Sequence, residues 1–153
     1  SFHIKAPIFV ARQLVKHKFL RWNEISRRYV DSDPEFYIPV LREATADKKQ
    51  GSGCAMGITL LDQVIQQQDI ESAKQYKYLL AMGVCEEQAR MVLPQNTMTE
   101  WYWSGSLDAF ADMCRLRLKA DTQFETSVVA ACIDVKMKEL FPVSWGALLD
   151  DGS

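Results

Sequence analysis

The chain has 153 residues, of which 48% are hydrophobic and 25% charged, with a formal net charge of -2 and a sequence pI of about 5.7. This balance is typical of an ordinary globular protein, and the length suits one domain that spans residues 1–153. The acidic pI argues against a nucleic-acid binder, because such a protein needs a basic face across much of the domain. No apolar run approaches the length that spans a bilayer, so we expect no membrane partner.

The cysteines favour a cytoplasmic protein. Four of them are widely spaced, without a CxxC pair, and only two histidines accompany them. A structural zinc site needs more closely spaced ligands, so we expect no metal. We interpret all four as reduced and mostly buried. They are Cys54, Cys85, Cys114 and Cys132.

The amino-terminal segment predicts a strand followed by a helix. Phe2 and Ile4 alternate with polar neighbours, as in a half-buried strand, and a strand at the first residue leads us to expect a further segment upstream. Pro7 favours the first turn of a helix whose spacing continues to the basic residues. On that helix Gln13 and His17 are four residues apart and share a face.

The stretch over 13–29 concentrates positive charge in a chain that is nearly neutral overall. Such a concentration costs self-repulsion unless anions share the space. A solvated basic helix end and loop is one interpretation, and interleaved hydrogen-bonding and stacking groups favour a ligand site instead. Ser26 suits a phosphate contact better than a nucleophile, because its only plausible base, His17, is distant in sequence. The six possible cations are Lys16, His17, Lys18, Arg21, Arg27 and Arg28.

The middle and end of the chain are mainly helical. A loop over 19–30 ends in a short extended piece, 25–30, and a polar surface loop covers 41–53. Aromatic residues and threonine predict a strand over 97–104. Helical periodicity predicts helices over 60–80, 86–93, 107–118 and 122–140, with a last short turn over 143–149.

Polar residues mark two of these helix starts. Ser106 can cap the helix over 107–118, whose buried stripe would reach Leu118. Asp121 or Thr122 can cap the next helix, with Glu125 reaching back to the backbone. Helices outnumber strands, so we expect an α+β fold: a helix-rich single domain with a small antiparallel sheet flanked by long helices.

Two arginines stand outside the basic stretch. Arg90 and Arg117 follow apolar helical residues and are candidates for inward-facing arginines, with a structural ion pair as the alternative for each. The planar fork of arginine holds a phosphate or a carbonyl edge bidentately. Trp101, Tyr102 and Trp103 could stack on a ring, but their position in a strand favours core packing.

Several motifs in series resemble the signature of the flavin-dependent thymidylate synthases. They are FHIKAPIFVARQ, KHKFLRWNEISRRY, ARMVLPQNTMTEWYWSGSL, RLRL and the Gln-x-Glu of Gln123 and Glu125. The resemblance implies reductive methylation of deoxyuridine monophosphate (dUMP) to dTMP. It implies methylenetetrahydrofolate as carbon donor and FAD, reduced by NADPH, as hydride donor. Family members are homotetramers whose active sites are built from several subunits, so the resemblance also implies a homotetramer.

The resemblance also implies roles for individual residues. Arg117 would be catalytic, polarising the uracil ring, since a fixed cation stabilises charge that develops beside it. The dUMP-binding residues would be Gln13, Lys16, Glu24, Ser26, Arg27, Arg28, Arg90 and Arg117. The FAD-binding residues would be Lys16, His17, Lys18, Ser106, Asp108 and Asp112.

Several of these positions differ from the family pattern. Lys16 and Lys18 stand where the family has arginines, which keeps the charge but loses the planar fork. Arg27 replaces a frequent glycine, and Asp108 and Asp112 replace residues that are commonly arginine and asparagine. The alternative function is therefore a catalytically impaired homologue that binds dUMP but holds flavin poorly.

Overall fold

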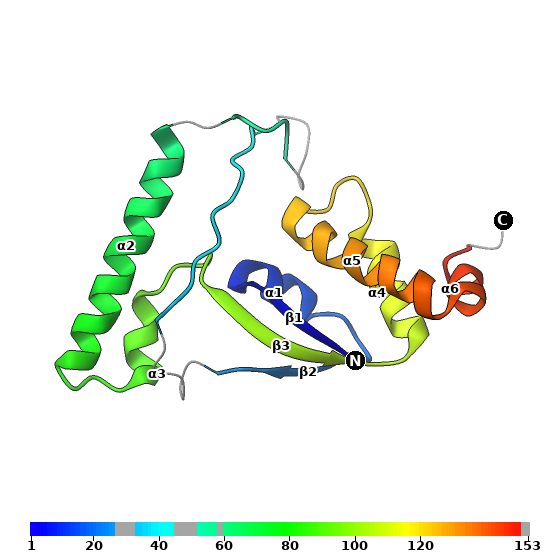
Figure 1. Cartoon of the computed structure of the whole chain (residues 1–153), viewed down its shortest axis with the longest axis horizontal. Helices are drawn as coiled ribbons and strands as arrows, with labels where there is room; N and C mark the ends of the chain where they lie inside the picture. The colour runs from blue at the N-terminus through cyan, green and yellow to red at the C-terminus, as the bar shows by residue number, and fades with distance from the viewer. Residues whose placement is uncertain (27–32, 45–51, 58–59, 151–153) are drawn as a thin grey trace.

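The computed structural model describes residues 1–26, 33–44, 52–57 and 60–150. This part of the chain holds six α-helices, one short 3-10 helix and a three-stranded antiparallel sheet, which confirms the predicted α+β fold. In Figure 1 the sheet lies between α2 at one end of the molecule and α4, α5 and α6 toward the other. The elements in chain order are β1 (Phe2–Pro7), α1 (Ile8–Leu14), β2 (Arg21–Glu24), α2 (Leu60–Ala81), α3 (Glu86–Ala89), η1 (Arg90–Val92), β3 (Met98–Ser104), α4 (Leu107–Arg117), α5 (Phe124–Leu140) and α6 (Pro142–Leu149).

The sheet has the order β1-β3-β2, with β3 antiparallel to both neighbours. Side chains alternate between the two faces along a strand, so Trp101 and Trp103 share one face and Tyr102 lies on the other. Both tryptophans are fully buried, which confirms their predicted core packing. The same prediction is wrong for Tyr102, which is exposed and stacks on His3, with ring centroids 4.8 Å apart.

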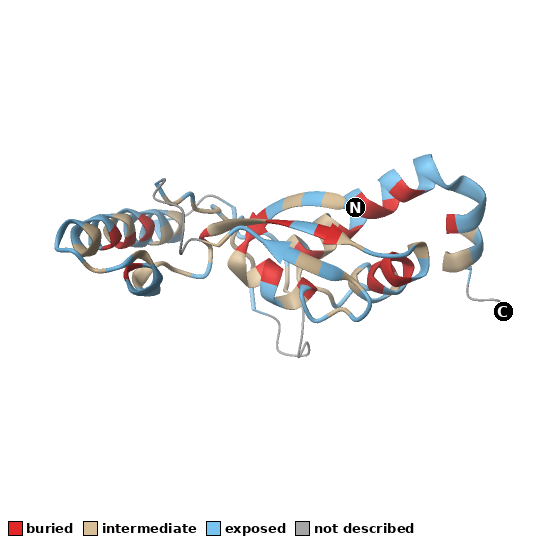
Figure 2. Cartoon of the chain, turned by 90° about the horizontal axis from the view of Figure 1, so that it is seen from below, coloured by how far each residue is buried: buried red, intermediate tan, exposed pale blue. Residues whose placement is uncertain are grey.

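Helices α1, α4 and α5 complete the core. Phe110 of α4 packs edge-on against Trp103, with ring centroids 5.5 Å apart, and against Phe2 at 5.2 Å. Val10 and Leu14 of α1 are fully buried in the same cluster. Figure 2 shows this concentration of buried residues at the centre of the molecule. The core thereby holds the ends of α1 and α4, which carry predicted site residues.

Helix α2 covers its predicted span, and Gly83 follows it with a φ of +83°, a conformation that favours glycine after a helix. Much of its apolar stripe is not covered, since Leu60 is 77% and Val64 64% exposed, although Tyr76 is buried. The reason is that α2 packs only against α3 and η1 among the described elements. The Asn96 amide donates to both oxygens of the buried Asp69, at 2.9 and 3.0 Å, and so ties α2 to the chain before β3. Neither α2 nor another helix in the described ranges is long and apolar enough to cross a membrane.

The segment after α1 differs from its prediction. The helix ends at Leu14 instead of continuing to His17, because the His17 N–H donates to the Leu14 carbonyl at 3.1 Å in a turn. Phe19 then has a φ of +62°, which redirects the chain toward the sheet. Arg21–Glu24 forms β2 where the sequence predicts a loop, since its backbone pairs with β3. Of the extended piece predicted over 25–30, only the first two residues are described, and neither is in a strand.

Helix α4 begins after Ser106, which occupies the N-cap position. The predicted hydrogen bond from this cap to the backbone is wrong, because the Ser106 hydroxyl bonds to the Asp108 carboxylate instead. Phe110 and Cys114 are fully buried in the predicted stripe. Leu118 is 41% exposed, since the helix ends one residue before it.

The start of α5 also corrects a prediction. Gln123 occupies the N-cap position, so neither Asp121 nor Thr122 caps the helix. Glu125 forms an ion pair with Arg42, with the Oε1 and Nη2 atoms 3.4 Å apart, and does not reach back to the backbone. The ion pair with Arg42 takes the place of the predicted contact to the backbone, because both side chains of this pair are largely buried.

The cysteines are all free, as predicted, but they are not mostly buried. Only Cys114 lies in the core, where burial and the nearby Asp134 raise the pKa of its thiol to about 12. A thiol with so high a pKa is an unreactive core residue. The exposed cysteines are Cys54, Cys85 and Cys132.

Helix α6 begins at Pro142 and packs against α4 and α5. Trp145 is fully buried, and its indole Nε1 donates to Asp134 Oδ1 at 2.8 Å. The Lys138 ammonium donates to Oδ2 of the same carboxylate at 2.8 Å. Burial opposes ionisation of Asp134, but these two hydrogen bonds outweigh it and hold its pKa below the ordinary value.

Asp134→Asn is expected to lower the free energy of unfolding at neutral pH by about 1.5–3 kcal/mol, the usual contribution of hydrogen bonds to a charged group. The asparagine amide can still accept a hydrogen bond from Trp145. It places N–H groups opposite the Lys138 ammonium, however, and these cannot accept a hydrogen bond. Because the folded pKa of Asp134 is depressed, its contribution is present above the unfolded pKa of about 3.9 and is lost as the pH falls through the folded pKa. Urea unfolding across this acid range measures the effect. The variant should lose less stability in acid than the wild type, and equal losses would contradict the prediction.

Candidate functional site

Three predicted site residues meet near the ends of α1 and α4. The Arg117 Nε donates to His17 Nε2 at 2.9 Å, and its Nη2 donates to the Gln13 backbone carbonyl at 3.1 Å. Gln13 is in the last turn of α1, His17 follows in the turn after it, and Arg117 ends α4. The guanidinium has five N–H donors. Within the described residues it makes no further hydrogen bond, so the rest of its fork is available to a ligand.

The bond between Arg117 and His17 defines the protonation state of the imidazole. A ring nitrogen that accepts a hydrogen bond carries no proton, so His17 is neutral with its proton on Nδ1. Burial and the positive charge of Arg117 lower the pKa of His17 and so maintain the neutral form. Burial also lowers the pKa of Arg117, which stays charged at neutral pH. The site therefore presents one fixed cation beside a neutral ring.

Helix α5 holds the side chain of Gln13. The Gln13 Nε2 donates to Gln123 Oε1, and its Oε1 accepts a hydrogen bond from the Thr126 hydroxyl at 3.2 Å. Thr126 is fully buried. It has no predicted role, and its three-residue spacing from Gln123, which places both on one helical face, is the only sequence signal that points to it.

A small cavity of about 90 Å³ brings Glu24 and Arg90 together. Glu24 is fixed at both oxygens, since Oε1 accepts from the Thr99 hydroxyl at 2.7 Å and Oε2 from the Trp22 indole at 3.0 Å. Arg90 is exposed and donates from Nε to a backbone carbonyl of the preceding turn at 3.3 Å. Ser26 lies two residues beyond Glu24 along the chain. The cavity thus holds one fixed carboxylate and one exposed guanidinium.

The loop that carries Lys16 and Lys18 packs against the start of α4. A Cβ at Gly105 would overlap the end of the Leu20 side chain and lie 3.2 Å from the Phe19 carbonyl oxygen, so this close approach favours glycine. Both lysines are exposed and form no ion pair within the described residues. The contact brings predicted flavin residues from two distant chain segments into one region.

The predicted flavin residues of α4 place carboxylates on its exposed face. A hydrogen bond from Ser106 lowers the pKa of Asp108, which is ionised at neutral pH. Asp112 forms an ion pair with Arg115, three residues further along the helix. Within the described residues, no ion pair therefore balances the charge of Asp108.

The predicted substrate residues form two groups in the single chain. One holds Gln13 and Arg117, together with the predicted flavin residue His17, and the other holds Glu24 and Arg90. No hydrogen bond or ion pair joins these groups among the residues that the structure describes. No group of three or more His, Cys, Asp or Glu in the same ranges is arranged to hold a metal ion. The predicted residues outside the described ranges are Arg27 and Arg28.

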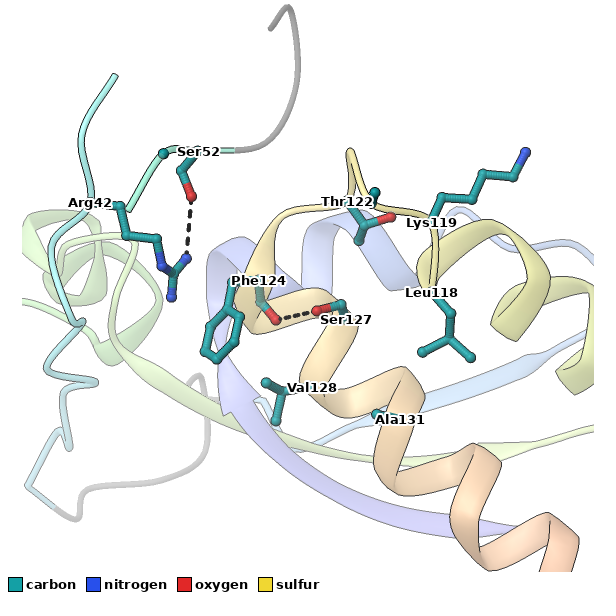
Figure 3. A pocket seen from close by; sticks show the side chains of 11 residues that line it. Arg42, Ser52, Leu118, Lys119, Thr122, Phe124, Ser127, Val128 and Ala131 are labelled. Atoms are coloured by element: carbon teal, nitrogen blue, oxygen red, sulfur yellow. Dashed lines mark hydrogen bonds between the residues drawn. The ribbon is translucent and has the colours of Figure 1, made fainter. Parts of the chain in front are cut away.

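A larger cavity of about 470 Å³ borders the first turns of α5 (Figure 3). Arg42 at its edge donates to the Ser52 hydroxyl at 3.4 Å, pairs with Glu125 and lies 4.0 Å from the centroid of the Phe124 ring. Figure 3 shows the Lys119 side chain extending away from Arg42. Because Glu125 already balances Arg42, and none of the predicted site residues lines this cavity, we assign it no ligand.

The fold and the site define a helix-rich α+β domain in which an arginine, a histidine and a glutamine join the ends of two helices. Residues 1–143 match the family model described as "Thymidylate synthase complementing protein" (Thy1). The chain belongs to this family, which confirms the resemblance seen in its motifs.

Named relatives agree with the family. The flavin-dependent thymidylate synthase of Thermus thermophilus is 41% identical over 152 residues, which are 96% of this chain and 55% of that protein. The one of Kosmotoga olearia is 37% identical over 159 residues, 98% of this chain and 67% of that protein. A crystal structure of the UMP/dUMP methylase PolB from Streptomyces cacaoi, bound with 5-Br UMP, superposes with a TM-score of 0.84 at 26% identity, covering 96% of this chain and 72% of that one. The chain thus spans little more than half the length of the Thermus relative.

Proposed function

We propose that the chain belongs to an enzyme that converts dUMP to dTMP by reductive methylation. Methylenetetrahydrofolate supplies the carbon, and FAD, reduced by NADPH, supplies the hydride. The observation that carries the proposal is the Arg117 cluster, in which His17 and the Gln13 carbonyl fix a guanidinium with donors to spare. A preorganised cation stabilises negative charge that develops on a carbonyl or ring nitrogen, and uracil offers both.

The substrate contacts follow from the two groups of residues. Arg117 polarises the uracil ring, so the chemistry needs no covalent nucleophile on the enzyme, and Ser26 binds the phosphate. The complete dUMP-binding set is Gln13, Lys16, Glu24, Ser26, Arg27, Arg28, Arg90 and Arg117. Since no hydrogen bond or ion pair joins the two groups among the described residues, we propose a homotetramer in which neighbouring subunits complete each site. The exposed apolar residues of α2 support an assembly of this kind.

The residues proposed for FAD fit its chemistry. The two exposed lysines beside the start of α4 suit an anionic diphosphate. The Asp108 carboxylate is an acceptor, which suits ribose hydroxyls or a ring N–H. When bound, FAD supplies the hydride that completes the methyl group. The proposed flavin set is Lys16, His17, Lys18, Ser106, Asp108 and Asp112. We place the protein in the cytoplasm, with residues 1–153 as one domain.

The test combines a spectrum with an assay. The purified protein should show flavin absorbance, and with reduced FAD and methylenetetrahydrofolate it should form dTMP from dUMP. Omitting the folate is the control, because the carbon then has no source. Protein without flavin absorbance that forms no dTMP under these conditions would refute the proposal.

A second candidate is a homologue that binds dUMP but has lost catalysis. The ionised Asp108, whose charge repels a phosphate, is the observation that favours it. Calorimetry distinguishes the two functions, since the second predicts dUMP binding with little or no FAD binding. Asp108→Asn should then improve FAD binding.

Arg90→Ala is expected to raise the dUMP dissociation constant by about tenfold or more, because a charge-assisted hydrogen bond contributes roughly 1.5–3 kcal/mol. Isothermal titration calorimetry with dUMP measures this dissociation constant. Arg12→Ala is the matched control, since it removes an exposed guanidinium of α1 that bonds only to Gln95 within the described residues. An unaltered dissociation constant for Arg90→Ala would count against this residue as a substrate contact.

A further inference from the structure

The Gln13 amide is held at both ends by α5. Its Oε1 accepts from Thr126, and its Nε2 donates to Gln123. A carboxamide has a donor end and an acceptor end, so directed bonds to both ends determine which way it points. The same residue gives its backbone carbonyl to Arg117. Gln13 therefore connects the catalytic arginine to the first turn of α5.

The buried threonine decides between the two possible amide orientations. Gln123 can present either end of its own amide, so alone it tolerates a reversed Gln13. Thr126 does not, because reversal would make its oxygen the acceptor and leave its O–H without a partner. Thr126 is fully buried, and within the described residues its hydroxyl bonds only to Gln13 Oε1. A buried donor without an acceptor carries its full desolvation cost.

This orientation determines what Gln13 offers to a ligand. With one Nε2 hydrogen on Gln123, the second N–H of that amide has no partner among the described residues, and neither have the remaining donors of Arg117. Gln13 and Arg117 therefore both keep N–H groups that a ligand can accept from. A ligand edge made of acceptors, such as the carbonyls of uracil, matches this arrangement.

We propose that Thr126 is a positioning residue for nucleotide binding: its buried hydroxyl orients the Gln13 amide so that an N–H faces the substrate. The proposal rests on the proposed function, because it takes dUMP as the ligand of Gln13. Thr126 does not contact the nucleotide in this arrangement and acts only through Gln13.

The experiment compares Thr126→Val with Thr126→Ser in the full chain. Valine removes the O–H at nearly constant shape, and the dUMP dissociation constant should rise about 5- to 30-fold, as expected for one lost buried hydrogen bond. Serine keeps the hydroxyl and should restore the wild-type affinity. In a Gln13→Ala background the valine substitution should have no further effect on affinity, which a merely structural role would not produce. Ser127→Ala, which removes a hydroxyl of the same turn that donates to the Phe124 carbonyl, should bind dUMP as the wild type does.

The outcomes separate this inference from the proposed function. A wild-type chain that binds no dUMP would refute the proposed function and this role together. A wild type that binds dUMP, with a folded Thr126→Val variant that binds it equally well, would overturn the inference alone. If the valine variant does not fold, Thr126→Ala, which removes the same hydroxyl without adding bulk, supplies the test, and wild-type affinity in that variant would overturn the inference.

Discussion

Replacing Arg117 with alanine is expected to reduce kcat by about 100- to 1000-fold, the usual cost of removing a donor aimed at developing charge. The dUMP dissociation constant should change much less, because the other proposed contacts to the nucleotide remain. The structural reason is that the guanidinium is held before any ligand arrives, by His17 and by the Gln13 carbonyl. A donor fixed in advance needs no reorganisation during the reaction. Steady-state kinetics and dUMP calorimetry on the same protein separate the two quantities.

Two further variants sharpen this result. Arg117→Lys keeps the charge but loses the planar fork, so it should recover only a small part of the lost turnover. His17→Phe removes the acceptor for Nε while keeping a ring, and should lower kcat less than the loss of the guanidinium itself. The exposed Arg12→Ala control should keep wild-type kinetics. An unchanged kcat in Arg117→Ala would refute the catalytic role of this residue.

Trp145→Ala is expected to lower the free energy of unfolding by about 3–5 kcal/mol, the usual cost of truncating a buried tryptophan. The substitution empties space between α6 and the helices it packs against, and it removes one donor from the buried Asp134 carboxylate. Denaturant unfolding followed by circular dichroism measures the change. A loss of this size is a large part of the total stability of a domain.

Trp145→Phe separates the two causes of that loss. Phenylalanine retains much of the apolar contact but cannot donate to Asp134. The free energy of unfolding of this variant should therefore lie between those of the wild type and the alanine variant. Tyr78→Ala is the control, because this aromatic residue of α2 is 66% exposed and its truncation should change stability by only about 0.5 kcal/mol. Equal stability of Trp145→Ala and the wild type would show that α6 does not contribute to the core.

Local patterns predicted most elements because local geometry produces them. The alternation around Phe2 and Ile4 predicted β1, and the aromatic run predicted β3 with two core tryptophans. The three-and-four spacing over 60–80 predicted α2. β2 was missed because its four residues form a strand only through pairing with β3, which lies far along the chain.

Contacts with distant residues also explain why the predicted helix ends were wrong. Helical spacing placed Gln13 and His17 on one face of a longer helix, whereas the chain leaves the helix at Leu14 and both residues still reach Arg117. Glu125 followed a capping pattern in the sequence but pairs with Arg42 in the structure. Local preference is worth about 1 kcal/mol at such positions, so a tertiary partner readily overrides it.

The amino-acid sequence alone determined the family of this protein, its α+β class and a set of candidate residues, because motifs and periodicity are properties of neighbouring residues. The tertiary structure decided which candidates meet. It joined Arg117 to His17 and Gln13 across about a hundred residues, brought Glu24 to Arg90, and placed the unpredicted Thr126 behind Gln13. These contacts depend on how α1, α4, α5, β2 and η1 pack together, and no spacing along the chain encodes that arrangement.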